Sequence, residues 1–591
     1  MYPLLFLLAA GLNILLGWHD WPAVLAGSLN DPDSYMRLLR IEQGIRAGHL
    51  VVSVARDDSG AGVYVEWSRL LDALLWLMAA PLAPFLGWHK ALYAAGVVLG
   101  PLGVGFLGLV LAWAVEPFAT RRYLWTAAIA AAVLPGFTTI AIPGVVHYHV
   151  LLLAMIALTT GCVARAWRDD RWYGFLAGAA GGFAIWLTPE TMPFVLAAYA
   201  MLLLRWWQVG NGVVLLATAA GCFDVLGFGF FVDPPGGGYG NPAVDRISYV
   251  YLTMALLLLG GTALLARLQG RSWPWLRRAR GPLGVALLGG LMAVWIVSFP
   301  RVVMGPYGIL PPAEARAFFG VISEQQPLRG AALLVFLFPG LCAVLYAFWR
   351  GLAGQPVDFE AMAVSALFAP RLSQRAVWLH IALCGVVCLV LGARFMLFAG
   401  FPTLLAAGML PVAISEMSSA WAEHPGRAGF ARIAALALVL AVPLATALAA
   451  PAPVVAGASA GATYPSCDLR HIAPLLAPVA GKIVLAEPQY TPELLYRSKI
   501  ETVGSLYHHG VAGYMRDRAA WRAMPGTTVP AAITATGADF VLFCPLPGRY
   551  ALVEDMPRET FWDAMEANAP PPWLSLMGSN AEGWRLYKIT R

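Results

Sequence analysis

The chain has 591 residues, of which 59% are hydrophobic and only 12% are charged, and its mean hydropathy is +0.68. These values exclude an ordinary soluble protein, which could not bury so much apolar surface. The net charge of +6 is small, and the arginines lie between hydrophobic segments. This pattern fits anionic lipid headgroups on one face of a membrane and argues against a nucleic-acid partner.

Hydrophobic segments recur along residues 1–450 at lengths typical of membrane-spanning helices. Thirteen are predicted to cross the membrane: 2–20, 92–115, 123–142, 147–166, 172–188, 191–206, 211–231, 247–268, 281–299, 330–350, 376–391, 395–414 and 430–450. A further apolar stretch, 70–86, is interpreted as a re-entrant or surface-lying helix. A fourteenth crossing there would place Arg121 and Arg122 on the opposite side from the other arginine-rich connections, against the positive-inside rule.

This topology puts the longer polar connections on one side of the membrane, the extracytoplasmic side. They are residues 28–69, 143–149 and 300–329. A linker, 451–464, then leads into a C-terminal segment, 465–591, on the same side. Four strands (481–488, 500–506, 538–544 and 583–590) and four helices (491–499, 516–524, 529–537 and 559–568) are predicted there. Their alternation indicates a small α/β domain with a largely parallel sheet.

The seven cysteines fall into two groups. Cys467 and Cys544 lie in the polar C-terminal segment and can form one disulfide if that segment faces an oxidising compartment, which the sequence alone does not decide. The other five lie in apolar segments, where cysteine usually serves in packing.

The first external loop carries two carboxylates, Asp31 and Asp33, just before a helical pattern that contains several arginines. Acidic residues at this position often cap a helix N-terminus. Carboxylates are also hard oxygen ligands for Mg²⁺ or Mn²⁺. Both interpretations stay open at the level of the residues.

The stretch Asp33-Ser34-Tyr35 resembles the first acidic motif of the oligosaccharyltransferase catalytic-subunit family, a family of GT-C glycosyltransferases. Three further stretches resemble that family in the same order. "PGFTTIAIPGVVHYHV" is similar to its second luminal loop, "VISEQQPL" to the Ser-Val-Ser-Glu-His-Gln-Pro stretch of its fifth external loop, and "GARFMLFAGFP" to the segment with a pyrophosphate-binding arginine.

The resemblance implies a GT-C fold with about thirteen spans and assigns roles by position. Asp33, with Asp31 as the alternative, would be a metal ligand or base. Glu324 would contact the metal or the acceptor, and Arg394 would bind the donor phosphate. The planar fork of an arginine suits phosphate oxygens.

His147 and His149 stand where the family carries an acidic pair, which is a departure from its pattern. With Asp33 and Glu324 they would form a mixed metal site. Imidazole is a poor ligand for Mg²⁺, acceptable for Mn²⁺ and better for Zn²⁺. Alternatively the metal is lost and a histidine serves as base or phosphate anchor, or the two histidines are polar residues at the membrane boundary.

A second departure concerns the C-terminal segment, which lacks the Trp-Trp-Asp-Tyr-Gly stretch that reads the glycosylation sequon in this family. The segment Tyr507–His509 is a candidate to reach the active site, although surface histidines without a role explain it equally well. Glu190 is interpreted mainly as an acid at a helix N-terminus after Pro189. Asp233 and Asp245 receive no predicted role.

Together these features predict a glycosyltransferase of a bacterial plasma membrane, with a polyprenyl-linked sugar donor and a glycan, lipid or protein acceptor on the periplasmic side. Two alternatives remain: a transporter or flippase of lipid-linked glycans, and an inactive membrane scaffold of the same fold. No internal repeat is visible, which weighs against a transporter built from inverted repeats.

Overall fold

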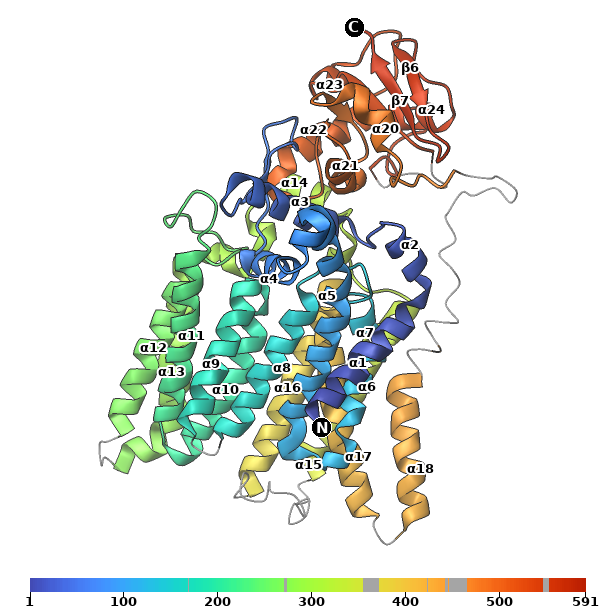
Figure 1. The fold of residues 1–591 in the computed structure, drawn as a ribbon. Helices are drawn as coiled ribbons and strands as arrows, with labels where there is room; N and C mark the ends of the chain where they lie inside the picture. Colours follow the sequence, from blue (N-terminus) through green and yellow to red (C-terminus); the bar gives the residue numbers. More distant parts are fainter. Residues whose placement is uncertain are drawn as a thin grey trace.

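The protein is described here from a computed structural model, which covers residues 1–167, 170–269, 274–353, 371–421, 424–441, 445, 465–545 and 552–591. A bundle of long helices forms one end of the molecule and a smaller domain with a β-sheet forms the other (Figure 1). The external helices α3 (Pro32–Ala47) and α14 (Pro312–Phe319) lie between them. The linker predicted at 451–464 lies outside the described residues. The prediction of a polytopic α-helical membrane protein with a C-terminal α/β domain is confirmed.

Nine helices among the described residues are long and apolar enough to cross a membrane. They are α1 (Tyr2–Leu16), α5 (Ala83–Val115), α8 (His149–Ala166), α11 (Val213–Val232), α12 (Tyr249–Gln269), α13 (Pro274–Ser298), α15 (Ala331–Ala353), α16 (Arg371–Arg394) and α17 (Gly400–Ala420). Four other predicted spans are helices outside this group: α6 (Trp125–Val133), α9 (Arg171–Leu187), α10 (Met192–Val209) and α18 (Pro425–Leu436). The last predicted span, 430–450, lies partly outside the described residues.

Two predicted boundaries differ from the structure for local reasons. The segment 123–142 was expected to be one helix, but α6 ends at Val133 and Leu134 is extended. Leu134 stands before Pro135, and the residue before a proline disfavours helical backbone. The short α7 (Pro135–Thr138) begins at that proline. The first part of the stretch 70–86 forms α4 (Arg69–Ala79), which lies across the end of the bundle that faces the C-terminal domain (Figure 1), and its last residues begin α5 at Ala83.

Small residues let the helices of the bundle approach closely. A Cβ on Gly178 of α9 would lie 1.9 Å from the carbonyl oxygen of Thr218 on α11, and one on Gly221 would lie 2.1 Å from that of Phe175. Such contacts are typical of membrane helices, whose association depends on packing rather than on the hydrophobic effect. The glycine-rich sequence of α9 therefore fixes its distance from α11.

The C-terminal domain has a five-stranded sheet in the order β4-β3-β5-β7-β6. Its strands are β3 (Ile483–Leu485), β4 (Glu501–Thr502), β5 (Phe540–Phe543), β6 (Leu574–Ser579) and β7 (Arg585–Ile589); its helices are α20 (Ala473–Leu476), α21 (Thr491–Arg497), α22 (Val511–Arg522), α23 (Ala531–Thr534) and α24 (Phe561–Glu566). β3 pairs in parallel with β4 and β5, but β7 is antiparallel to β5 and β6. The expectation of a largely parallel sheet was wrong at this edge, because the unpredicted β6 joins β7 through a turn too short for a parallel connection.

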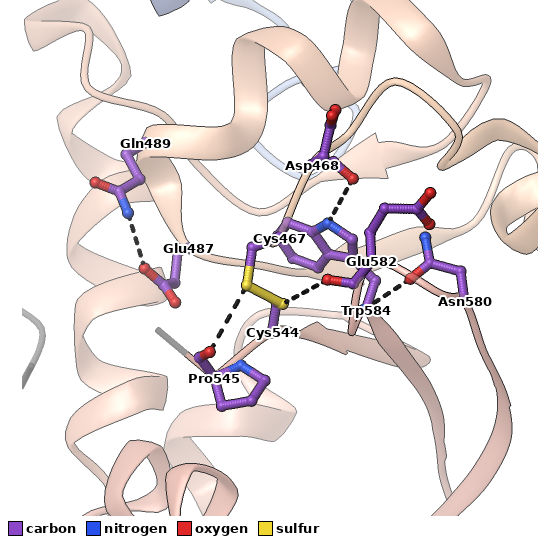
Figure 2. Close-up of a disulfide and its surroundings, with 9 residues drawn as sticks. All are labelled: Cys467, Asp468, Glu487, Gln489, Cys544, Pro545, Asn580, Glu582 and Trp584. Carbon is purple, nitrogen blue, oxygen red and sulfur yellow. Dashed lines mark hydrogen bonds between the residues drawn. A yellow bond between two sulfur atoms is a disulfide. The ribbon is translucent and has the colours of Figure 1, made fainter. Parts of the chain in front are cut away.

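Cys467 and Cys544 form a disulfide, which the sequence had left open. It joins the start of the C-terminal domain to the residue that follows β5 (Figure 2). Beside it, the backbone amide of Cys467 donates to the carbonyl of Glu582, and the indole of Trp584 donates to the carbonyl of Asp468. The five remaining cysteines are free.

The first external loop holds the C-terminal domain against the bundle. The loop contains a short hairpin, β1 (Ser53–Val54) and β2 (Val63–Tyr64), with Arg56 and Asp57 between its strands. The Arg56 guanidinium donates to the carbonyls of Leu495, Ser498 and Ile500, and Asp57 accepts hydrogen bonds from the hydroxyls of Thr502 and Ser505. From the bundle side, α14 adds Phe318 and Phe319 to the apolar core of the domain.

Candidate active site

The first acidic segment is positioned by the N-terminus of α3. Asp31 is its N-cap: the carboxylate accepts a hydrogen bond from the Ser34 amide at 3.1 Å, and Pro32 starts the helix. Gly48 ends the helix in the left-handed conformation, with φ at 73°. This local design presents both Asp31 and Asp33 at one end of a short, largely buried helix.

Hydrogen bonds join this segment to the second external loop. The Asn30 amide group donates to the carbonyl of Pro143 at 2.9 Å, and the Val146 amide donates to the Ser34 hydroxyl at 2.8 Å. As a result, Nε2 of His147 lies 2.6 Å from Oδ2 of Asp31 and 4.0 Å from Oδ2 of Asp33.

His149, the first residue of α8, and Glu324 complete the cluster. The Nδ1 atoms of His147 and His149 are 3.0 Å apart. One ligand atom from each of His147, His149 and Glu324 lies within 4.8 Å of the others, and the same holds for Asp31, Asp33 and His147. Residues from three external segments, far apart in the sequence, therefore meet in one place.

Arg394 lies beside the Glu324 segment rather than in the cluster. The Leu328 amide donates to the carbonyl of Ala393, and the Met396 amide donates to that of Gln326, both at 3.0 Å. These bonds pair the two segments that carry Glu324 and Arg394. The Arg394 side chain itself is exposed, with its guanidinium 4.7 Å from the ring centre of Phe395.

The cluster borders a cavity of about 130 Å³ between the end of the bundle and the C-terminal domain. Its polar lining comprises Asp33, Arg37, Glu66, His147, Tyr148, His149, Glu190, Glu324, Gln325, Tyr507 and His508. The Asp33 side chain is 39% exposed, and it lines this cavity. The Tyr507 hydroxyl of the C-terminal domain donates to Oδ1 of Asp33 at 2.7 Å.

The carboxylates in this cavity are crowded. Burial raises the pKa of Asp33 to about 7, and the neighbouring Asp31 carboxylate adds to that shift. Burial and the nearby Glu324 likewise raise the pKa of Glu190 to about 7, and burial raises the pKa of Glu324. Arg37 brings little compensating charge, because its guanidinium is bound to Asp72 at 2.9 Å. The cavity thus favours a cationic group.

Asp31 and His147 behave as an ion pair. Burial alone would lower the pKa of His147, but the nearby carboxylates, Asp31 first and then Asp33 and Glu324, together outweigh burial and raise this pKa to about 9. Burial alone would raise the pKa of Asp31, but His147 and the hydrogen bonds from Ser34 together hold this pKa below its ordinary value. Without a bound cation, the pair is charged at neutral pH.

The cluster fits a divalent cation. Nε2 of His149 is buried and has no hydrogen-bond partner among the described residues, and a buried ring nitrogen without a partner costs free energy. A cation held by histidine nitrogens and carboxylate oxygens would satisfy this atom and offset the charge of the acids. Such a donor set suits Zn²⁺ or Mn²⁺ better than Mg²⁺.

The structure brings in residues to which sequence analysis gave little or no role. Glu190 lines the cavity, and Glu66 lines it next to His508. Asp245 accepts hydrogen bonds from Nε2 of both His508 and His509 at 2.7 Å. No local pattern marks Glu66 or Asp245, because each acquires its partners only when the C-terminal domain docks on the external loops.

Neither a protein-family model nor a curated protein matches the sequence. Solved structures do match. The oligosaccharyltransferase AglB from Archaeoglobus fulgidus, in complex with an inhibitory peptide and a dolichol-phosphate, superposes with a TM-score of 0.67 at 13% identity, over 100% of this chain and 74% of that one. The same archaeal enzyme tethered to an acceptor peptide with the NVT sequon gives 0.64 at 15% identity, over 100% and 74% of the two chains. Its complex with Zn and sulfate gives 0.62 at 13% identity, over 91% and 67%.

The chain has the GT-C fold. Identity of 13–15% establishes the fold and leaves the activity to be argued from the site. In this GT-C bundle, a second cavity of about 540 Å³ lies among α8, α10, α16 and α17 and is lined almost wholly by apolar side chains. Phe401 lines both this cavity and a smaller one that reaches His149 and Glu324.

Proposed function

We propose that the protein is a membrane glycosyltransferase that moves a sugar or oligosaccharide from a polyprenyl phosphate or pyrophosphate to an acceptor on the extracytoplasmic face. The observation that carries this proposal is the convergence of Asp33, His147, His149 and Glu324 on one cavity of a GT-C fold, with Asp31 paired to His147 behind them.

Asp33, His147, His149 and Glu324 would hold a divalent cation, with Asp31 as an additional carboxylate. A similar archaeal structure is a complex with Zn and sulfate, which supports a role for a metal ion in the proposed function. When bound, the cation would supply electrostatic stabilisation for the phosphate that leaves the sugar. The histidine pair favours Zn²⁺ or Mn²⁺ over Mg²⁺ in this role.

The side chains of the cavity have separate tasks in the proposed reaction. Asp33 would be a ligand when the cation is bound; in the metal-free alternative its carboxylate, with a pKa of about 7, would accept a proton from a nucleophilic acceptor group. Glu324, on the opposite segment, would orient the acceptor. Arg394 would place its planar fork against the donor phosphate, since its segment is paired with that of Glu324. Tyr507 would hold the Asp33 carboxylate in position through its hydroxyl.

The donor is proposed to be lipid-linked. The apolar cavity of about 540 Å³ within the bundle supports this, because it offers a path for a polyprenyl chain beside the site. One similar archaeal structure contains a dolichol-phosphate. A long apolar tail buried there would also leave the phosphate at the end of the bundle, where the charged residues lie.

The acceptor remains a broad class: a protein, a lipid or a growing glycan. The archaeal relative was solved with acceptor and inhibitory peptides, which favours a peptide. The chain lacks the Trp-Trp-Asp-Tyr-Gly stretch expected for sequon recognition, which weakens that analogy. In this chain, Tyr507 and His508 form the cavity wall that the C-terminal domain contributes.

We place the protein in a bacterial plasma membrane with its C-terminal domain outside the cytoplasm. The disulfide between Cys467 and Cys544 supports this orientation, because disulfides persist mainly in oxidising compartments. This orientation would put the cavity and the acceptor in the periplasm.

The test is complementation of a deletion strain, with cell-surface glycans and lipid-linked donors analysed by mass spectrometry. Asp33→Asn and Glu324→Gln should each reduce transfer by about 100-fold or more and cause the donor to accumulate. Asp20→Asn and Glu314→Gln are matched controls. Asp20 lies between α1 and the first external loop, Glu314 lies in the same loop as Glu324, and neither lines the cavity. Wild-type glycans in both site variants would overturn the enzyme proposal; donor retained in the cytoplasmic leaflet would indicate a flippase.

A further inference from the structure

A second group of histidines and carboxylates reaches another wall of the same cavity through Glu66 and His508. Glu66 follows β2 in the first external loop, Asp245 lies in the loop between α11 and α12, and His508 and His509 begin a short turn in the C-terminal domain. The ligand atoms that Glu66, His508 and His509 can offer lie within 4.8 Å of one another. None of these residues belongs to the cluster around His147.

Hydrogen bonding prepares the two imidazoles for a metal. Oδ2 of Asp245 accepts from Nε2 of His508 and from Nε2 of His509, each at 2.7 Å. Both Nε2 atoms are thereby fixed as donors, which leaves each Nδ1 with a free lone pair in the neutral ring. A carboxylate that orients the far nitrogen of a ligating histidine is the usual outer partner in metal sites.

Glu66 supplies the third ligand. Its Oε1 lies 3.7 Å from Nδ1 of His508, a separation expected for two ligands that each bind one ion at about 2.0–2.2 Å. Its other oxygen, Oε2, is buried and has no hydrogen-bond partner among the described residues. A cation between Glu66 and the two imidazoles would satisfy these atoms together.

The group is held rigidly. The ring of His509 packs edge-on against Tyr64 of β2, with 4.7 Å between ring centres. Gly510 lies so close to β2 that a Cβ there would approach Cγ2 of Val63 to 2.8 Å. The Asp245 side chain is only 3% exposed. Close packing of this kind fixes ligands before the ion arrives, which metal sites require.

We propose that Glu66, His508 and His509 bind a second divalent cation of the Zn²⁺ class, with Asp245 as the positioning residue behind the two imidazoles. Two nitrogens and one carboxylate oxygen are a donor set that Zn²⁺ accepts readily. The ion ties the C-terminal domain to the first external loop and so fixes this wall of the cavity. The proposal does not depend on glycosyl transfer.

The test is zinc stoichiometry of the purified full-length protein in detergent, stripped with a chelator and titrated with Zn²⁺ alone. With both sites filled, wild-type protein should bind two equivalents and His508→Ala/His509→Ala one, as should His147→Ala/His149→Ala. His471→Ala, a change at an exposed histidine of the same domain, should leave the stoichiometry unchanged. Zn²⁺ should raise the melting temperature of His147→Ala/His149→Ala but not that of a protein that also lacks His508 and His509.

If the His147 cluster binds no zinc, wild-type protein should bind one equivalent, which His508→Ala/His509→Ala loses and His147→Ala/His149→Ala keeps. That result would support the second site while removing the metal from the proposed function. Asp245→Asn, which retains all three ligands, should weaken zinc binding by about 10- to 100-fold even if the alanine variants misfold. Unchanged zinc binding in Asp245→Asn, or the wild-type stoichiometry in folded His508→Ala/His509→Ala, would overturn the proposal.

Discussion

Oδ2 of Asp31 lies 2.6 Å from Nε2 of His147, although 116 residues separate the two in the chain. Asp31 caps α3 and His147 precedes α8, so this ion pair joins the first external loop to the second. His147 also belongs to both ligand sets of its own cluster, with Asp31 and Asp33 on one side and with His149 and Glu324 on the other. The pair therefore links the stability of the external loops to the geometry of the site.

In the presence of a chelator, the pair should make stability depend on pH in a defined direction. The pKa of His147 is raised from 6.5 to about 9, so its contribution is complete below about pH 6.5 and is lost as the pH rises through 9. The pKa of Asp31 is lowered, so its contribution is present above about pH 3.8 and is lost as the pH falls further. The melting temperature of wild-type protein should exceed that of His147→Gln at pH 7.5, and the difference should shrink by pH 10.

His471→Gln is the matched control for this measurement, because His471 is exposed and contacts Glu582 of the C-terminal domain rather than a residue of the site. Its melting temperature should follow that of the wild type at both pH values. A constant difference between wild type and His147→Gln from pH 7.5 to 10 would show that His147 is not held in its charged form.

Tyr507→Phe should shift the pH dependence of metal binding at the His147 cluster. Asp33 must be deprotonated to ligate, and its pKa is about 7, so metal affinity should fall as the pH drops through this range. The Tyr507 hydroxyl lowers the pKa of Asp33 by donating to the carboxylate. Removing the hydroxyl should therefore move the loss of affinity to higher pH.

Calorimetric titration with Mn²⁺ between pH 6 and 8 checks this shift. Tyr490→Phe is the control, since Tyr490 packs on Trp584 in the same domain. If both tyrosine variants give the wild-type pH profile, the hydrogen bond seen at Asp33 has no part in metal binding.

Much of the fold could be predicted from the sequence because its signals are local. A few neighbouring residues are enough to indicate each of these elements. They are the long apolar segments, α3 with Asp31 as its cap and Gly48 at its end, and the strands around "IVL" and "FVLF". The β6 strand was not predicted, because apolar and polar residues alternate poorly in its sequence, "LSLMGS", and the strand is largely exposed. The break at Leu134 depends on one proline inside an apolar run.

The site could be anticipated only where a resemblance ordered its parts along the chain. Asp33, His147, His149 and Glu324 were named in this way, and their meeting around one cavity is a tertiary result. Asp245 and Glu66 could not be predicted in this way, since neither lies in a recognisable motif. Each can be linked to the site only through its contact with His508. Arg394 was expected at the donor phosphate; its exposed side chain beside the Glu324 segment leaves that role a prediction.

Gly408→Phe should impair use of a long-chain donor. Gly408 of α17 lines the apolar cavity in the bundle, and a Cβ there would meet only Val115, at 3.7 Å, which is ordinary contact. Gly408→Ala should therefore be tolerated, whereas a phenyl ring would fill space proposed for the polyprenyl tail. We expect KM for a long polyprenyl donor to rise about 10-fold in Gly408→Phe, with a smaller rise for a short-chain analogue. Equal effects on both donors would place the tail elsewhere.

Loss of the disulfide should destabilise the C-terminal domain without removing the site. Cys467 and Cys544 close a loop with a sequence separation of 77, for which loop-closure entropy predicts about 4 kcal/mol of stabilisation. Denaturant unfolding of Cys467→Ser/Cys544→Ser, followed by domain tryptophan fluorescence, should show a loss of this order relative to wild type and to the control Cys342→Ala, which changes a free cysteine of α15.

Thiol titration of unfolded wild-type protein should count five of its seven cysteines as free without reductant. Because the disulfide packs with Trp584 in an apolar cluster separate from that of Tyr507, zinc stoichiometry should stay unchanged in the double variant under conditions where it is folded. Seven free thiols, or an unfolding midpoint equal to that of wild type, would contradict the bond and with it the support it gives for an oxidising compartment.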